Sequence, residues 1–83
     1  MISPMVKIYS TPWCTYCKMA KTFFDQHGVK YEEVNVQGNP EAQKEMIAKS
    51  QQMGVPVIDV NGKIVVGFDR PQLAELLGLQ VNQ

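Results

Sequence analysis

The stretch MVKIYSTPWCTYC, residues 5–17, decides the fold, because it predicts a strand followed directly by a helix. Residues 5–10 are rich in β-forming side chains, and Pro12 ends that run, so a buried strand is predicted there. A helix is predicted from about Thr15, where apolar residues begin to recur at helical spacing, to a stop at Gly28. Both cysteines of the chain lie at the junction of these two elements.

The cysteine pair Cys14-x-x-Cys17 is the feature that carries chemistry. At a helix start this spacing puts the two sulfurs on one face, about one turn apart, close enough to form a disulfide. Unpaired backbone N–H groups and the positive end of the helix dipole favour the thiolate of Cys14, and Lys18 and Lys21 add to the positive field. Only a thiolate attacks a disulfide, so Cys14 is predicted to be the exposed nucleophile and Cys17 the resolving cysteine.

Working outward, the rest of the chain predicts three more strands and two more helices. They are a strand over 31–36, a helix from Asn39-Pro40 to about Ser50, strands over 57–60 and 63–66, and a helix after Asp69. Asn61-Gly62 is a two-residue type I′ turn signal, which makes the last two strands a hairpin. Asp69, with Gln72 three residues later, predicts the cap of the last helix.

The predicted order is therefore β-α-β-α-β-β-α. A right-handed crossover makes the first two strands parallel, and the hairpin adds two antiparallel strands. Helices then cover both faces of a four-stranded mixed sheet. This α/β arrangement is the smallest form of the thioredoxin-like architecture.

Length and composition limit the classes of function. Eighty-three residues predict a single domain over 1–83, in which residues 1–4 form an unstructured lead. Eight basic and eight acidic residues balance to zero without a run of like charge, which argues against nucleic-acid and membrane-surface partners. The N-terminus lacks the pattern of a signal peptide, so a cytoplasmic location is expected, where thiols are kept reduced.

Two other uses of the cysteines remain open. A zinc site typically needs four ligands, and besides the two cysteines the chain offers only His27. No metal site within one chain is therefore predicted. An iron–sulfur cluster held between two chains stays as an alternative, although a monomer is expected. A third hypothesis is a partner-binding module without turnover.

Two further segments are predicted to meet a substrate. Val55-Pro56 is a candidate for a cis peptide bond, and with Gly54 before it and a strand after it the segment presents backbone groups to an extended chain. Trp13 follows a proline in a loop and is predicted to be an exposed apolar contact for a substrate.

From Met5 to Leu79 the chain resembles glutaredoxin-like proteins of the thioredoxin-fold superfamily. The matching segments are Lys7-Ile8-Tyr9-Ser10, Cys14-Thr15-Tyr16-Cys17, Val55-Pro56, Asn61-Gly62 and Gly67-Phe68-Asp69. The resemblance implies a thiol–disulfide oxidoreductase of electron transport and cell redox homeostasis that reduces protein disulfides by dithiol exchange without a tightly bound cofactor. It also implies a cis Pro56 facing the active site. The predicted substrate-binding residues are Lys7, Trp13, Thr15, Tyr16, Val55, Pro56, Gly67 and Asp69, of which Lys7, Tyr16, Val55 and Asp69 match glutathione contacts.

The chain departs from the family pattern in ways that concern the electron donor. Thr15 replaces a common proline, Gly54 replaces a threonine, and the Gly-Gly-x-Asp-Asp stretch reads VGFDR over residues 66–70. Arg70 reverses the charge that faces the glutathione ammonium in the family, which predicts weaker glutathione binding. Gly67-Phe68 resembles members that take electrons from thioredoxin reductase, so glutathione and thioredoxin reductase are both kept as donors.

Overall fold

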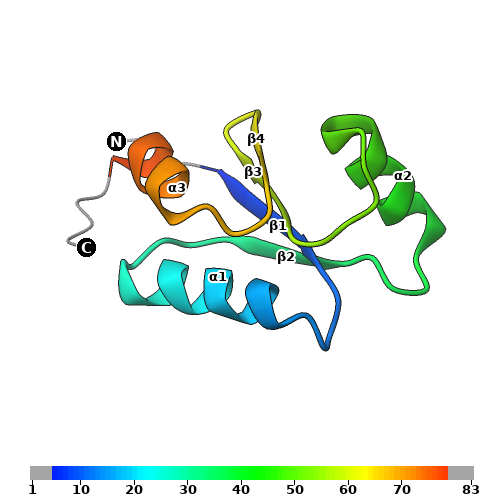
Figure 1. Ribbon diagram of the computed structural model, residues 1–83, viewed down its shortest axis with the longest axis horizontal. Coiled ribbons are helices and arrows are strands. Elements are labelled where there is room, and N and C mark those ends of the chain that lie inside the picture. The colour runs from blue at the N-terminus through cyan, green and yellow to red at the C-terminus, as the bar shows by residue number, and fades with distance from the viewer. Residues whose placement is uncertain (1–4, 79–83) are drawn as a thin grey trace.

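The computed structural model describes residues 5–78, so the predicted lead at 1–4 lies outside the described residues. Within them the elements follow the predicted order (Figure 1). They are β1 (Val6–Ser10), α1 (Thr15–Gln26), β2 (Glu32–Asn35), α2 (Pro40–Ser50), β3 (Val57–Val60), β4 (Lys63–Val66) and α3 (Arg70–Leu77). The predicted succession of strands and helices is confirmed.

The four strands form one mixed sheet in the order β2-β1-β3-β4. β1 runs parallel to β2, with Ser10 opposite Asn35, whereas β3 runs antiparallel to both β1 and β4. The hairpin turns at Asn61 and Gly62, whose φ angles are 51° and 90°. Two successive positive φ values are what a type I′ turn requires, so the predicted turn is confirmed.

Side chains that alternate along the strands build a core on each face of the sheet. On one face Ile8 and Ile58 pack with Phe24 of α1 and Leu73 of α3. On the other face Tyr9 and Val57 belong to a second cluster with Met46 of α2. Accordingly, in Figure 1 α1 lies below the strands and α3 at their upper left, whereas α2 lies at their right. Helices on both faces, as predicted, give the thioredoxin-like fold.

Caps place the helices as the sequence predicts. The side chains of Asn39 and Asp69 accept hydrogen bonds from the amides of Ala42 and Gln72, at 3.1 and 3.2 Å. These bonds satisfy amides that have no partner within α2 and α3. Gly28 follows α1 with a φ of 66°, a conformation that costs glycine little.

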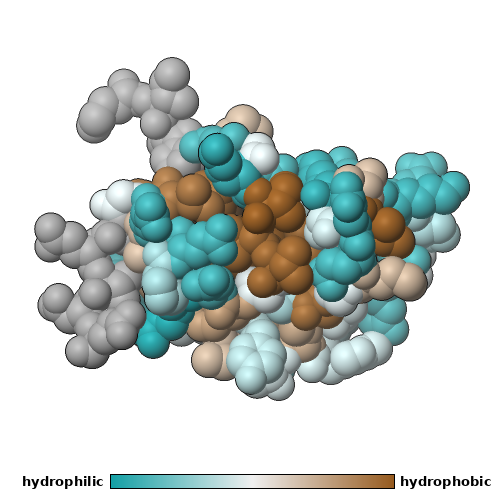
Figure 2. Space-filling model, turned by 45° about the horizontal axis from the view of Figure 1, so that its top comes forward, coloured by the Kyte–Doolittle hydropathy of each residue, from teal (hydrophilic) through white to brown (hydrophobic). Residues whose placement is uncertain are grey.

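The surface keeps some large apolar side chains in contact with solvent. Figure 2 shows hydrophobic side chains gathered in the middle of one face, with polar areas on either side. Trp13, Tyr16 and Met53 are 70%, 62% and 74% exposed. Trp13 and Tyr16 flank Cys14 in the sequence, so the cysteine pair has apolar surface next to it.

Candidate active site

Cys14 and Cys17 form a disulfide at the start of α1. Cys14 is the N-cap residue, with extended backbone angles, and its amide donates to the Thr11 carbonyl at 3.3 Å. The Cα atoms of the two cysteines are 5.2 Å apart, within the range that a disulfide spans. Cys17 is completely buried, whereas Cys14 is only half-buried. The predicted nucleophile Cys14 is therefore more exposed than the predicted resolving Cys17, as these roles require.

The surroundings of Cys14 favour negative charge on its sulfur. The Cys17 amide donates a hydrogen bond to Cys14 Sγ at 3.1 Å. The first turn of α1 contains no acidic residue that would oppose the positive end of the helix dipole. A reduced Cys14 is consequently stabilised as a thiolate, the form that attacks disulfides.

The Val55-Pro56 peptide bond is cis, as the resemblance implied. Pro56 is buried and Val55 is half-buried. The Pro56 carbonyl accepts a hydrogen bond from the Gly67 amide at 2.8 Å, and Gly67 has a φ of 82°. This bond holds the loop between β4 and α3 against the loop that contains the cis proline.

One side of the cysteine pair has a hollow of about 320 Å³, called here the tryptophan groove. Thr11 and Trp13 from the loop before Cys14 line it together with Met53 and Val55. The loop that carries the nucleophile and the cis-proline loop thus share one surface. The sequence predicted Trp13 and Val55 for substrate contact, and the structure brings these two together.

The other side has a hollow of about 290 Å³, called here the cationic groove. Thr15 and Lys18 of α1 line it together with Phe68 and Arg70, from the loop before α3 and its first residue. Asp69 lies between Phe68 and Arg70 in the chain, and its carboxylate serves as the cap of α3. The cap is confirmed, whereas contact of Asp69, Thr15 or Tyr16 with a substrate stays a prediction.

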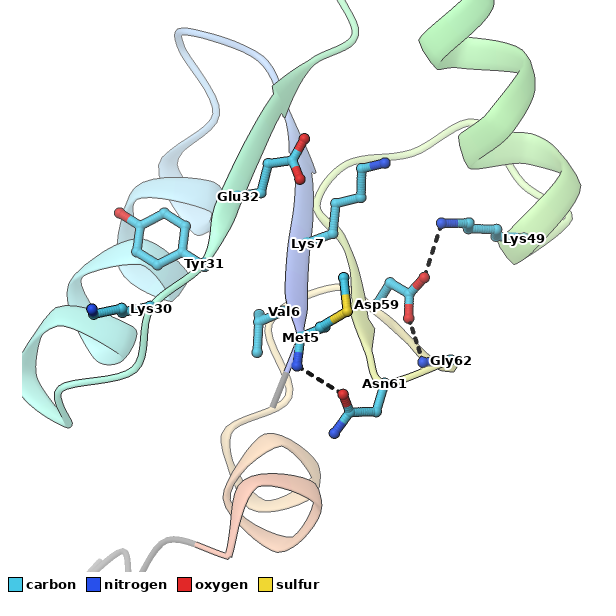
Figure 3. A pocket seen from close by; sticks show the side chains of 10 residues that line it. All are labelled: Met5, Val6, Lys7, Lys30, Tyr31, Glu32, Lys49, Asp59, Asn61 and Gly62. Carbon is cyan, nitrogen blue, oxygen red and sulfur yellow. Dashed lines mark hydrogen bonds and ion pairs between the residues drawn. The ribbon is translucent and has the colours of Figure 1, made fainter. Parts of the chain in front are cut away.

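The structure places Lys7 away from the cysteine pair, and its contact with glutathione stays a prediction. Lys7 is the second residue of β1, about 10 Å of extended strand from Ser10, where the chain leaves the sheet toward Cys14. Its Nζ pairs with Glu45 Oε2 of α2 at 3.3 Å. Lys7 lines a different hollow, together with Met5 and Asn61 (Figure 3).

A network of polar side chains, called here the lysine network, holds that distant region. Tyr9 Oη donates to Glu45 Oε2 at 2.6 Å, and Lys49 Nζ donates to Tyr9 Oη at 2.8 Å and to Asp59 Oδ2 at 2.9 Å. The bond from Tyr9 lowers the pKa of Glu45, and the bond to Tyr9 raises the pKa of Lys49. Burial opposes ionisation of Asp59, but the bonds from Lys49 and the Gly62 amide outweigh it and lower its pKa. The network joins α2 to β1 and β3.

Sequence reasoning missed Thr11 and Met53 of the tryptophan groove. Thr11 follows the last residue of β1, and a polar residue at a strand end before a cysteine is a usable signal. Met53 lies in the connection between α2 and β3, where no sequence pattern ties it to Cys14.

Among residues 5–78 no cluster of three histidine, cysteine or acidic side chains is placed to hold a metal. His27 lies at the far end of α1 against Phe23, with ring centroids 4.6 Å apart.

A thioredoxin-like sheet with a C-x-x-C disulfide at a helix start, beside a cis proline, defines the class of thiol–disulfide oxidoreductases. The sequence matches the Glutaredoxin family model over residues 6–65. The chain belongs to the glutaredoxin family.

Individual proteins agree with this assignment. The chain is 40% identical over 73 residues to an "uncharacterized glutaredoxin-like 8.6 kDa protein in rubredoxin operon" of Clostridium pasteurianum, covering 88% of this chain and 97% of that protein. A crystal structure of a glutaredoxin from Archaeoglobus fulgidus superimposes with a TM-score of 0.80 at 25% identity, covering 87% and 84% of the two chains. The glutaredoxin-like NrdH-redoxin of Escherichia coli, described as having a thioredoxin-like activity profile, gives a TM-score of 0.74 at 25% identity and covers 95% and 99%. No helix within residues 5–78 is long and apolar enough to cross a membrane.

Proposed function

We propose that this protein reduces protein disulfides by dithiol exchange at Cys14 and Cys17. The observation that supports this most is the cysteine pair itself, in which an accessible Cys14 lies over a fully buried Cys17 at the start of α1. An external sulfur can reach Cys14, whereas the buried Cys17 can react only with Cys14.

The exchange proceeds in two steps. The Cys14 thiolate attacks one sulfur of the substrate disulfide, and the bonding electron pair leaves on the other substrate sulfur, which takes up a proton. Cys17, as its thiolate, then attacks the Cys14 sulfur and forms the Cys14–Cys17 disulfide, which releases the second substrate sulfur as a thiolate. Two electrons pass to the substrate, and an external reductant must return them.

For that reductant we propose thioredoxin reductase in preference to glutathione. Arg70 is exposed at the start of α3, where the family pattern has the acidic residue that faces the glutathione ammonium. Like charges at contact distance reduce affinity. The similarity to NrdH-redoxin, whose description gives it a thioredoxin-like profile, supports the same choice. Glutathione then acts as a slower reductant.

The proposal includes the setting in which the protein works. The reductive direction fits the cytoplasm, where thiols are kept reduced. We propose a monomer without a tightly bound cofactor, since the exchange needs only the two sulfurs and an external donor.

The test uses three proteins, namely the wild type, Cys14→Ser and Cys17→Ser. With NADPH, thioredoxin reductase and a protein disulfide, the wild type should turn over and Cys14→Ser should be inactive. Cys17→Ser should accumulate a mixed disulfide on Cys14, detected as an added mass that dithiothreitol removes. Turnover by Cys14→Ser would refute the nucleophile, and undiminished turnover by Cys17→Ser without trapping would refute the resolving role. Faster reduction by glutathione than by the reductase would refute the choice of donor.

A further inference from the structure

The cationic groove starts directly at the nucleophile. Thr15 follows Cys14 in the chain, and Lys18 lies one turn further along α1. Phe68 and Arg70 form the opposite side, and Met19 of α1 adds a second apolar side chain to the lining. A polypeptide whose cysteine reaches Cys14 therefore has its neighbouring residues next to two cations and an apolar surface.

The cations of this groove differ from the paired lysines of the molecule. Lys7, Lys21 and Lys49 each form an ion pair with a carboxylate, at 3.3, 2.7 and 2.9 Å. Lys18 and Arg70 are both exposed and form no ion pair with any other residue of the segment 5–78. Two positive charges thus face solvent beside Cys14.

Asp69 has the carboxylate nearest to Arg70 in sequence, and it forms no ion pair with Arg70 or Lys18. Asp69 precedes Arg70, but its Oδ1 accepts from the Gln72 amide at 3.2 Å and so serves the helix cap. The first turns of α1 and α3 contain no acidic residue. The groove therefore carries two cations without an ion-pair partner among the described residues, and the one carboxylate next to either of them in sequence, Asp69, is held by the helix cap.

We propose that the cationic groove selects disulfide-containing proteins whose reacting cysteine has acidic residues close to it in sequence. This inference rests on the proposed function and names the substrate class of the same site. In an extended chain, residues two or three positions from the cysteine lie roughly 7–10 Å away, a distance that the long side chains of Lys18 and Arg70 can bridge. Because both cations are exposed, they act mainly on the association rate, and salt screens their effect.

The test compares two synthetic peptides that each contain one disulfide and differ only in carrying two Glu or two Gln beside the reacting cysteine. Fully reduced protein, freed of reductant, is mixed with each peptide, and its oxidation is followed by the fluorescence of Trp13, the only tryptophan of the chain. Omitting the electron donor makes the result independent of the choice of reductase. We expect the Glu peptide to react about 5–10 times faster at low ionic strength, with the ratio falling in high salt.

Variants assign the preference to the groove. In the double variant Lys18→Gln/Arg70→Gln the ratio should fall to about 1, and in Lys18→Glu/Arg70→Glu it should fall below 1. The matched control Lys44→Gln/Lys63→Gln removes the same charge from exposed positions outside the groove and should keep the wild-type ratio. Equal rates for both peptides with the wild type, or an unchanged ratio in the groove variants, would overturn the proposal. Failure of the wild type to oxidise with either peptide would instead overturn the proposed function.

Discussion

Lys7 and Lys49, which lie between α2 and the sheet, have carboxylate partners, whereas Lys18 and Arg70 beside Cys14 have none within residues 5–78. In the lysine network, Lys49 and Asp59 make a short ion pair, and Tyr9 links Lys49 to Glu45. At the cysteine pair, Lys18 and Arg70 face solvent without a carboxylate partner in the described part of the chain. Basic side chains thus stabilise the fold in the lysine network and are available to a substrate beside Cys14.

The difference follows from how each region is built. The lysine network lies between α2 and the sheet, where Lys49 and Asp59 are partly buried and pair with each other. The cysteine pair lies where β1 leads into α1, at the surface, and a disulfide substrate has to approach it there. Changes in the network should therefore alter stability alone, and changes around Cys14 should alter reactivity alone.

The largest effect that separates the two regions is expected from Lys49→Ala. The substitution leaves the Asp59 carboxylate, with a side chain only 16% exposed, without its strongest partner. Hydrogen bonds to charged groups contribute about 1.5–3 kcal/mol, and solvent screening of the partly exposed pair lowers this value, so the free energy of unfolding should fall by about 1–2 kcal/mol in urea denaturation. Oxidation of the reduced variant by a disulfide peptide should keep its wild-type rate.

The matched control for this prediction is Lys44→Ala on the same helix. Lys44 is exposed and has no ion pair within residues 5–78, so its loss should change stability by less than about 0.5 kcal/mol. Because alanine favours the helix more than lysine does, helix propensity cannot explain a loss of stability, and equal destabilisation by both substitutions would show that the network contributes nothing specific. A slower reaction with the disulfide peptide would show that the two regions are coupled.

A smaller effect is expected from Glu45→Gln in the dependence of stability on pH. The hydrogen bond from Tyr9 lowers the pKa of Glu45 in the folded state, so the unfolded chain takes up the proton first as the pH falls. The stabilisation is therefore present above the ordinary carboxyl pKa of about 4.3 and is lost as the pH falls through the lower folded value. We expect the wild type to lose stability between about pH 5 and 3 more steeply than Glu45→Gln.

The comparison substitution for the pH measurement is Glu41→Gln in the first turn of α2. The Glu41 carboxylate has no ion pair among the described residues, so this variant removes a carboxylate from α2 without removing a contact of the network, and both variants are compared with the wild type in denaturant titrations across the same pH range. If Glu45→Gln follows the wild-type curve as closely as Glu41→Gln does, the Tyr9 bond does not contribute to acid stability.

The sequence predicted the parts of the fold that depend on local physics. The type I′ turn at Asn61-Gly62, the cap at Asp69 and the helix that begins after Cys14 each depend on residues a few positions apart. Such signals can be read along the chain without knowledge of tertiary contacts. The cysteine pair was predictable for the same reason, since its spacing and its helix position are both local.

Contacts between distant residues account for what the sequence did not predict. Lys7 was predicted to bind the substrate. In the structure it pairs with Glu45, which lies 38 positions away on α2, the helix that covers the sheet face opposite to α1. Met53 joins Trp13 in one groove only because α2 returns the chain to that end of the sheet. The start of β1 differs by one residue, because the Met5 amide donates to the Asn61 side chain at 2.7 Å and not to a neighbouring strand.

The most direct test of the account is alkylation of the reduced protein with iodoacetamide at about pH 7, read by mass spectrometry of peptides. Cys14 combines half-burial with a hydrogen bond from the Cys17 amide, whereas Cys17 is completely buried. An ordinary thiol is only a few per cent ionised at this pH, so Cys14 should react about tenfold faster than free cysteine while Cys17 stays unmodified. Modification of Cys17 first, or of both cysteines at the rate of free cysteine, would contradict the assignment of Cys14 as the activated nucleophile.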